Sequence, residues 1–216
     1  MRIWFFVVAM ASLLISCADY ALIERNESVL MNKTKSLKII CIDPQFYYDD
    51  ATLNFKHEKR QKIINIIKKN IITSSKKNGI MLELYTQETG EKAGYYEKLL
   101  PVKNAILRAN SNQLTSLNFN NNPEMNSIQK KVFIYPPKIY PEFSSLKNIY
   151  GTPYFSYLGI YADGGSLILY HVVVDTDLCE TVYREYKKVK SGIQENAIAQ
   201  MIFDSYVNLT LELKAP

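Results

Sequence analysis

The sequence predicts an α/β (α+β) fold, in which one mixed sheet carries helices packed against it. A strand, a helix and a second strand follow one another between residues 38 and 85, three strand patterns fill 153–190, and a helical repeat closes the chain at 193–211. The 216 residues are 47% hydrophobic and 22% charged, which is ordinary globular usage and excludes a disordered or fibrous chain.

The N-terminal half predicts a βαβ-like unit. Residues 38–43 are an apolar strand that ends before Pro44. In residues 56–77, apolar positions recur at spacings of three and four, as on the buried face of a helix. Asn78-Gly79 is a strong helix stop, and residues 80–85 then form a second strand.

The middle of the chain has weaker patterns. Residues 93–109 predict a second helix, with a break or late start near Pro101. An Asn-rich polar loop is expected over 110–126. A strand at 131–135 and a Pro- and Tyr-rich connection at 138–152 follow.

The C-terminal third predicts an antiparallel three-stranded meander followed by a helix. A strand at 153–161 is followed by one at 166–176 that is apolar on both faces and therefore central. The charged, alternating strand at 180–190 is expected at the sheet edge, where its charges would discourage further pairing. The final helix would bury one face made of Ile193, Ala197, Ile198, Met201, Ile202, Ser205, Tyr206 and Leu209.

The first residues are typical of a secretory signal. Met1-Arg2 is a short basic start, and an apolar run from Ile3 extends almost to Cys17. The run is too short to be a comfortable membrane span. We therefore expect a signal peptide at 1–16, an irregular tether at 17–36, and a single α/β domain at 37–216.

Leu14-Ile15-Ser16-Cys17 resembles the lipobox of bacterial lipoproteins. The resemblance implies cleavage between Ser16 and Cys17, with a diacylglyceryl group on the Cys17 thiol and acylation (palmitate) of the new amine. Two or more acyl chains anchor a protein stably. Ala18, where an Asp would retain the protein in the inner membrane, implies the outer membrane, and we favour its periplasmic face. An ordinary secreted protein and an uncleaved anchor are the alternatives.

A second, more distant resemblance concerns the fold. A strand, a helix and a strand, followed later by the sequence Val-Val-Val-Asp-Thr-Asp at 172–177, look like the periplasmic α/β domain of the curli-secretion-channel lipoprotein group. Leu178-Cys179 stands where that group would have a glycine. This resemblance implies a fold only, and no functional residue follows from it.

No catalytic, metal or cofactor motif stands out, so we expect no catalytic residue, no metal and no cofactor. The two histidines are isolated: His57 is expected in solvent, and His171 half-buried in the sheet with a backbone or Tyr partner. Cys41 and Cys179 are expected to be separate buried or half-buried thiols, with a disulfide as the alternative. The basic stretch 56–77 lacks the Arg and aromatic interleaving of a nucleic-acid surface, so we expect a solvated helix face, or contact with an anionic lipid or polymer surface.

Tyrosines gather in the second half of the chain near several prolines. Since Tyr supplies apolar area with a polar tip, a partner surface is a candidate there. The alternative is that the same rings fill the core. The candidate surface consists of Tyr135, Tyr140, Tyr150, Tyr154, Tyr157 and Tyr161.

Together these observations favour a membrane-anchored, non-enzymatic envelope assembly or adaptor lipoprotein that binds an envelope protein and no nucleic acid. One alternative is a lipid-anchored enzyme acting on envelope polymers, with His171 or the Asp49-Asp50 loop as its site. The other is a surface-exposed binding lipoprotein.

Overall fold

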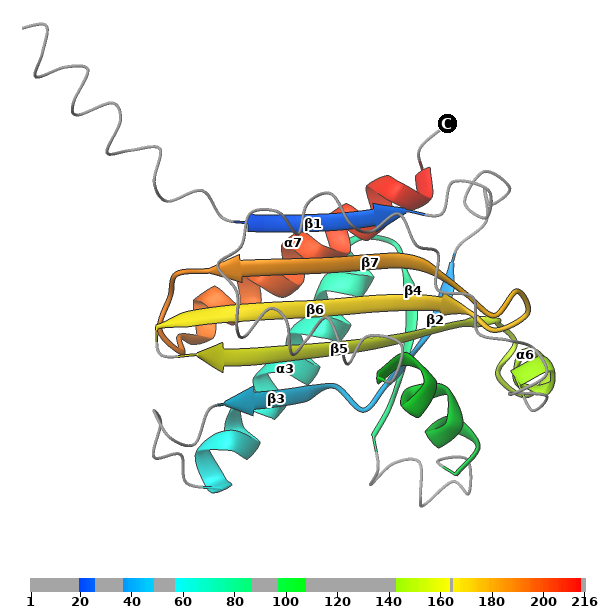
Figure 1. The fold of residues 1–216 in the computed structure, drawn as a ribbon, viewed down its shortest axis with the longest axis horizontal. Coiled ribbons are helices and arrows are strands. Elements are labelled where there is room, and N and C mark those ends of the chain that lie inside the picture. The colour runs from blue at the N-terminus through cyan, green and yellow to red at the C-terminus, as the bar shows by residue number, and fades with distance from the viewer. Residues whose placement is uncertain are drawn as a thin grey trace, which may run out of the picture.

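The structure is a computed structural model that describes residues 20–25, 37–48, 57–86, 97–107, 143–163 and 165–214. Its centre is a seven-stranded mixed sheet in the order β1-β7-β6-β5-β2-β4, with β3 pairing β5 (Figure 1). The strands are β1 (Tyr20–Arg25), β2 (Lys38–Ile42), β3 (Gln45–Tyr48), β4 (Met81–Tyr85), β5 (Tyr154–Asp163), β6 (Ser166–Asp175) and β7 (Glu180–Val189). The helices are α3 (His57–Lys77), α6 (Phe143–Tyr150) and α7 (Glu195–Lys214), and residues 97–107 are also helical.

The predicted βαβ unit is confirmed. β2 and β4 run parallel, with Lys38 opposite Met81 and Ile42 opposite Tyr85, and α3 connects them. Gly79 follows the helix with φ 71°, the left-handed conformation that glycine adopts without strain. Ile63, Ile64, Ile67 and Ile71 form the buried face of α3, at the expected spacing.

The predicted meander and C-terminal helix are also confirmed. β5, β6 and β7 pair antiparallel over their length, and every residue of β6 after Ser166 is buried. β6 is thus a central strand, as its apolar sequence indicates. The predicted face of α7 is buried from Ile198 to Leu209, whereas Ile193 lies before the helix begins and is only partly buried.

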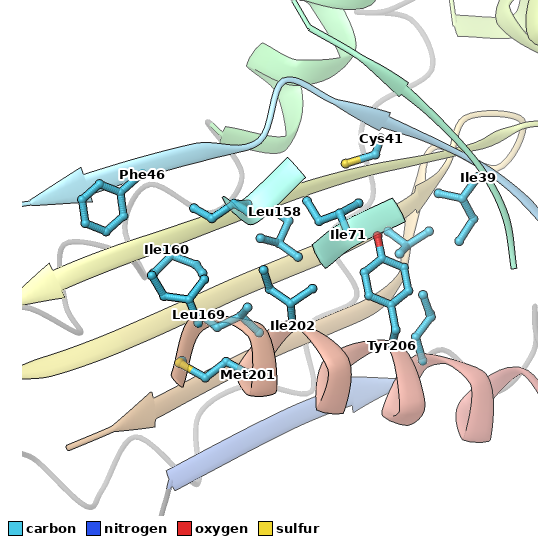
Figure 2. Packing of buried hydrophobic residues seen from close by; sticks show 14 of the residues in the cluster. Ile39, Cys41, Phe46, Ile71, Leu158, Ile160, Leu169, Met201, Ile202 and Tyr206 are labelled. Carbon is cyan, nitrogen blue, oxygen red and sulfur yellow. The ribbon is translucent and has the colours of Figure 1, made fainter. Parts of the chain in front are cut away.

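The sheet has a hydrophobic layer on each face. α3 and α7 lie side by side on one face, where their isoleucines and Tyr206 pack against β2, β5 and β6 (Figure 2). α6 and helix 97–107 cover part of the opposite face through Leu99, Phe143 and Leu146. Among the described helices, none is long and apolar enough to cross a membrane.

The segment 17–36 and the edge strand need a correction. Within the expected irregular tether, Tyr20–Arg25 form β1, which pairs antiparallel with all of Tyr183–Lys188. β7 is therefore not an edge strand. Two of its charged side chains are bound by α7 and do not protect an edge: Lys187 pairs with Asp204 at 2.7 Å, and Glu185 accepts a hydrogen bond from Asn208.

The middle of the chain differs in part from expectation. The connection 138–152 contains α6, whose final turn is fixed to β2 because Lys38 Nζ donates to the Tyr150 carbonyl at 2.8 Å. Helix 97–107 shows no break at Pro101, and residues 93–96, where the sequence predicts the start of the helix, lie outside the described residues. The expected loop at 110–126 and the strand at 131–135 lie outside the described residues.

Candidate functional site

The predicted lipidation residue Cys17, with Ser16 and the rest of the lipobox, lies outside the described residues. The structure does fix where the chain after it enters the sheet, because β1 begins at Tyr20 opposite Lys188. Three residues span at most about 11 Å between Cα atoms. An attachment at Cys17 therefore keeps the C-terminal end of β7 close to the point of attachment.

We call this part of the molecule the Lys188 end. It comprises the start of β1, the end of β7, the turn between β5 and β6, and the first turns of α3 and α7 (Figure 1). Leu167 lies opposite Val189, and Lys62 of α3 pairs with Glu195 of α7 at 3.2 Å. The elements are thus joined by contacts, although they come from four parts of the sequence.

The described side chains of the Lys188 end are mainly basic. Lys59, Lys62 and Lys190 are exposed, and Arg60 and Lys188 are partly exposed. Among the side chains that the structure describes here, the acidic ones are Glu58 and Glu195, and Glu195 is paired with Lys62. Such an excess favours contact with anionic surfaces.

A second polar cluster lies buried between the sheet and α7. His171 Nδ1 and Ser205 Oγ are 2.8 Å apart, and His171 has no exposed surface. Beside them the Tyr183 hydroxyl donates to Glu185 Oε2 at 2.8 Å and to the Ser205 carbonyl at 3.2 Å. Burial lowers the pKa of His171 to about 3, so the imidazole is neutral.

This cluster has the residue types of a nucleophile and its base, but no route for a substrate. His171, Glu185 and Ser205 each have 0% exposed surface. The rings of Tyr183 and Tyr206 lie 5.4 and 5.2 Å from the His171 ring and enclose it. The cluster therefore fixes α7 to the sheet. His171 is more deeply buried than expected, and its partner is a serine rather than a tyrosine or a backbone group.

A third cluster lies at the carboxyl end of β2. Asp43 has φ 40°, and its backbone N–H donates to the Tyr85 carbonyl at 2.7 Å. Its carboxylate binds Lys103 and accepts from Gln45 Nε2 at 2.9 Å. Both side chains of the Asp43–Lys103 pair are mostly buried, at 13% and 14% exposed, so the pair connects helix 97–107 to the sheet.

The candidate tyrosine surface is corrected by the structure. Tyr150, Tyr154 and Tyr157 are 4%, 6% and 1% exposed, so these rings fill the core, as the alternative reading expects. Tyr157 also binds the exposed Tyr47, with the two hydroxyls 2.8 Å apart. Tyr161 is partly exposed, whereas Tyr135 and Tyr140 lie outside the described residues.

The remaining sequence candidates are placed as follows. Cys41 and Cys179 are free and buried, in the cores on opposite faces of the sheet, as expected for separate thiols. Burial raises the pKa of Cys41 to about 12. His57 is exposed, as expected. Asp49-Asp50 is outside the described residues, within which no group of His, Cys, Asp and Glu could hold a metal ion.

Ser205, Tyr183 and Glu185 form the buried cluster, yet sequence reasoning did not select them as a group. Residues 183 and 185 share a strand face with each other, and 205 sits on a predicted helix face. Only the packing of α7 across β6 and β7 brings the three together. No local sequence pattern predicts how α7 packs across these two strands.

Comparison with known proteins gives distant likenesses of fold. No sequence family matches the chain, and no curated protein is similar to it in sequence. Among solved structures, it is similar to the PelC dodecamer from Paraburkholderia phytofirmans, with 8% identity over 92% of this chain and 99% of that one, at a TM-score of 0.43.

Two further likenesses cover most of the other chain. Lipoprotein GNA1162 from Neisseria meningitidis is 9% identical over 80% of this chain and 94% of that one, at a TM-score of 0.35. The LpoB C-terminal domain from Salmonella enterica is 9% identical over 76% and 91%, at a TM-score of 0.33. At these TM-scores and identities, the likenesses concern the fold alone.

Proposed function

We propose that the chain is a bacterial lipoprotein that is held by a lipid on Cys17 at the periplasmic face of the outer membrane. There it acts as a non-enzymatic assembly or adaptor factor for another envelope protein. The observation that carries the proposal is the position of the lipobox directly before a strand of the sheet: Cys17 precedes Tyr20, the first residue of β1, by three positions.

A lipid at this position would hold the folded body and not a loose tail. All six residues of β1 are paired with β7, so the anchor is coupled to the sheet through backbone hydrogen bonds. Each buried CH₂ group contributes about 0.8 kcal/mol, so a diacyl or triacyl anchor is long-lived. Such an attachment suits a protein that must remain at a membrane surface while it binds a partner.

The burial of His171, one of the two enzyme candidates, also supports an adaptor, while the other, Asp49-Asp50, lies outside the described residues. His171 is enclosed under α7, where no polymer substrate reaches it. Asp175 is 3% exposed, and its carboxylate accepts hydrogen bonds from the backbone N–H groups of Asp177 and Leu178. The side chains of His171 and Asp175 therefore both form hydrogen bonds that stabilise the fold.

The test is a Cys17→Ala substitution in cells. We expect the wild-type protein to fractionate with the outer membrane and to carry a lipid adduct on Cys17 by mass spectrometry. The variant should be soluble in the periplasm or stall with its signal peptide attached. Cys179→Ala, which changes a buried thiol of the folded body, is the matched control and should fractionate like the wild type.

Unchanged fractionation of Cys17→Ala, or a mature N-terminus without a lipid, would contradict the proposal. Protease treatment of whole cells reports the face: the protein should be protected until the outer membrane is opened. Crosslinking in the envelope, followed by mass spectrometry, then identifies the partner. Recovery of a peptidoglycan or polysaccharide cleavage activity with the purified protein would contradict the adaptor role.

A further inference from the structure

We propose that the Lys188 end of the domain lies against the anionic headgroups of the leaflet that holds the lipid anchor. The domain then stands with its strands pointing away from the membrane. This inference rests on the proposed lipidation of Cys17, and it adds an interaction surface and its partner, a bilayer containing anionic phospholipid.

The first argument is reach. Cys17 is at most about 11 Å from Tyr20, measured between Cα atoms, and Tyr20 lies opposite Lys188. A lipid on Cys17 begins at the boundary between headgroups and acyl chains. The short connection therefore keeps the Lys188 end beside the leaflet as long as β1 stays paired, whereas the opposite end approaches the same leaflet only if the long strands lie flat along its surface.

The second argument is charge. The Lys188 end presents five basic side chains against two acidic ones among the described residues, and the basic residues come from both α3 and β7. Basic side chains next to a membrane anchor are attracted to anionic lipids within about one Debye length of the surface. The basic stretch at the start of α3 thus joins the basic end of β7 in one surface.

The opposite end is closer to neutral. There the exposed or partly exposed described side chains are four basic ones, Lys38, Lys76, Lys77 and Lys147, and three acidic ones, Glu83, Asp177 and Glu180, while the carboxylates of Asp175 and Glu212 are buried. Two of these lysines are engaged in ion pairs, Lys38 with Glu83 and Lys147 with Asp177. An anionic leaflet therefore attracts the Lys188 end in preference to this one.

The third argument is the direction of the long strands. β5, β6 and β7 each contain ten residues and run between the two ends (Figure 1). Ten strand residues extend about 33 Å. The turn at Asp177-Leu178, where Leu178 is 49% exposed, would project by about that distance from the leaflet and remain accessible to a partner.

The test measures which end is close to lipid. The lipidated full chain is labelled with an environment-sensitive fluorophore at Lys190→Cys or, as the matched control, at Lys76→Cys, an exposed lysine near the end of α3. Each protein is placed in phosphatidylcholine vesicles that contain phosphatidylglycerol and a headgroup-linked nitroxide quencher. We expect quenching at position 190 to exceed that at position 76 several-fold.

A second pair of variants tests the charges. With the label at Asn196→Cys, in the first turn of α7, Lys188→Glu combined with Lys190→Glu should reduce quenching in these vesicles. Lys76→Glu combined with Lys77→Glu changes the charge equally at the other end and should leave quenching unchanged. In vesicles of phosphatidylcholine alone, the first pair should lose its effect.

Flotation of the vesicles separates the two proposals. Protein that does not float with the vesicles contradicts the lipid anchor itself. Protein that floats but shows equal quenching at positions 190 and 76, or stronger quenching at 76, contradicts only the proposed orientation.

Discussion

His171 on β6 and Ser205 on α7 form a hydrogen bond of 2.8 Å in which neither residue has any exposed surface. The other ring nitrogen, Nε2, has no hydrogen-bond partner in the described part of the chain. In a neutral imidazole with its proton on Nδ1, Nδ1–H donates to Ser205 Oγ. The group without a partner is then Nε2, which is an acceptor and not a donor. This pair is one of the polar contacts that hold α7 against the sheet, beside those of Tyr183, Glu185 and Lys187.

Ser205→Ala should destabilise the protein. The substitution leaves the Nδ1–H group of His171 buried without an acceptor, which costs about 1–3 kcal/mol. Urea unfolding followed by circular dichroism measures this loss. Ser191→Ala is the control, because the Ser191 hydroxyl forms an exposed hydrogen bond to Gly192 and its removal should change stability by less than about 0.5 kcal/mol.

The contribution of His171 should depend on pH. Burial lowers its pKa from 6.5 to about 3, so below pH 6.5 the unfolded chain takes up a proton that the folded one refuses. Stability from this source is fully present above pH 6.5 and falls by about 1.4 kcal/mol per pH unit as the pH drops toward about 3.

The measurement is urea unfolding between neutral pH and pH 4, with wild type compared against His171→Gln. The difference in unfolding free energy should become smaller as the pH falls, since the variant lacks the titrating ring. His57→Gln changes an exposed histidine and should follow the wild type. If the difference in unfolding free energy between wild type and His171→Gln stayed constant with pH, His171 would accept a proton in the folded protein as it does in the unfolded chain.

The ion pair of Asp43 and Lys103 should be worth more than a surface pair. Asp43→Asn keeps a residue that tolerates the observed φ of 40° but removes the negative charge, and we expect a loss of about 1–3 kcal/mol. Asp43→Ala should lose about 1–2 kcal/mol more, because alanine is strained in that conformation. Thermal unfolding of both variants checks the order, and equal stability of the two would mean that the backbone relaxes.

β1 should contribute to the protection of β7. Ile23→Pro removes a backbone donor from a strand whose residue 23 lies opposite Glu185. Hydrogen exchange of the β7 amides should accelerate, whereas that of β5 should not change. Ile23→Thr keeps the N–H group and the branched side chain, so it is the matched control. Equal exchange in both variants would show that β1 pairing adds no protection.

The parts of the fold that local patterns determine were predictable from sequence. The isoleucines of α3 repeat with the period of a helix, Gly79 ends it, and the apolar sequence of β6 indicates burial on both faces. These features depend on residues that are close in the sequence.

The parts that depend on distant partners were not predictable. The lysines and glutamates of β7 make its sequence look like that of an exposed edge strand. Their partners are distant in the sequence, because Lys187 and Glu185 are bound by Asp204 and Asn208 on α7. Likewise, the sequence is equally compatible with a surface position and with a core position for Tyr150, Tyr154 and Tyr157. Only packing decides for the core: Tyr150 and Tyr157 contact Phe155 and Tyr170 on one face of the sheet, and Tyr154 lies in the cluster on the other face.

The antiparallel pair of β1 and β7 has a consequence for the order in which the molecule assembles. Tyr20 and Lys188 are sheet neighbours that lie near opposite ends of the chain. The N-terminus emerges first during synthesis or translocation. β1 therefore has no strand to pair with until β7 has also emerged. The segment that begins three residues after Cys17 thus stays unpaired until most of the chain has been made.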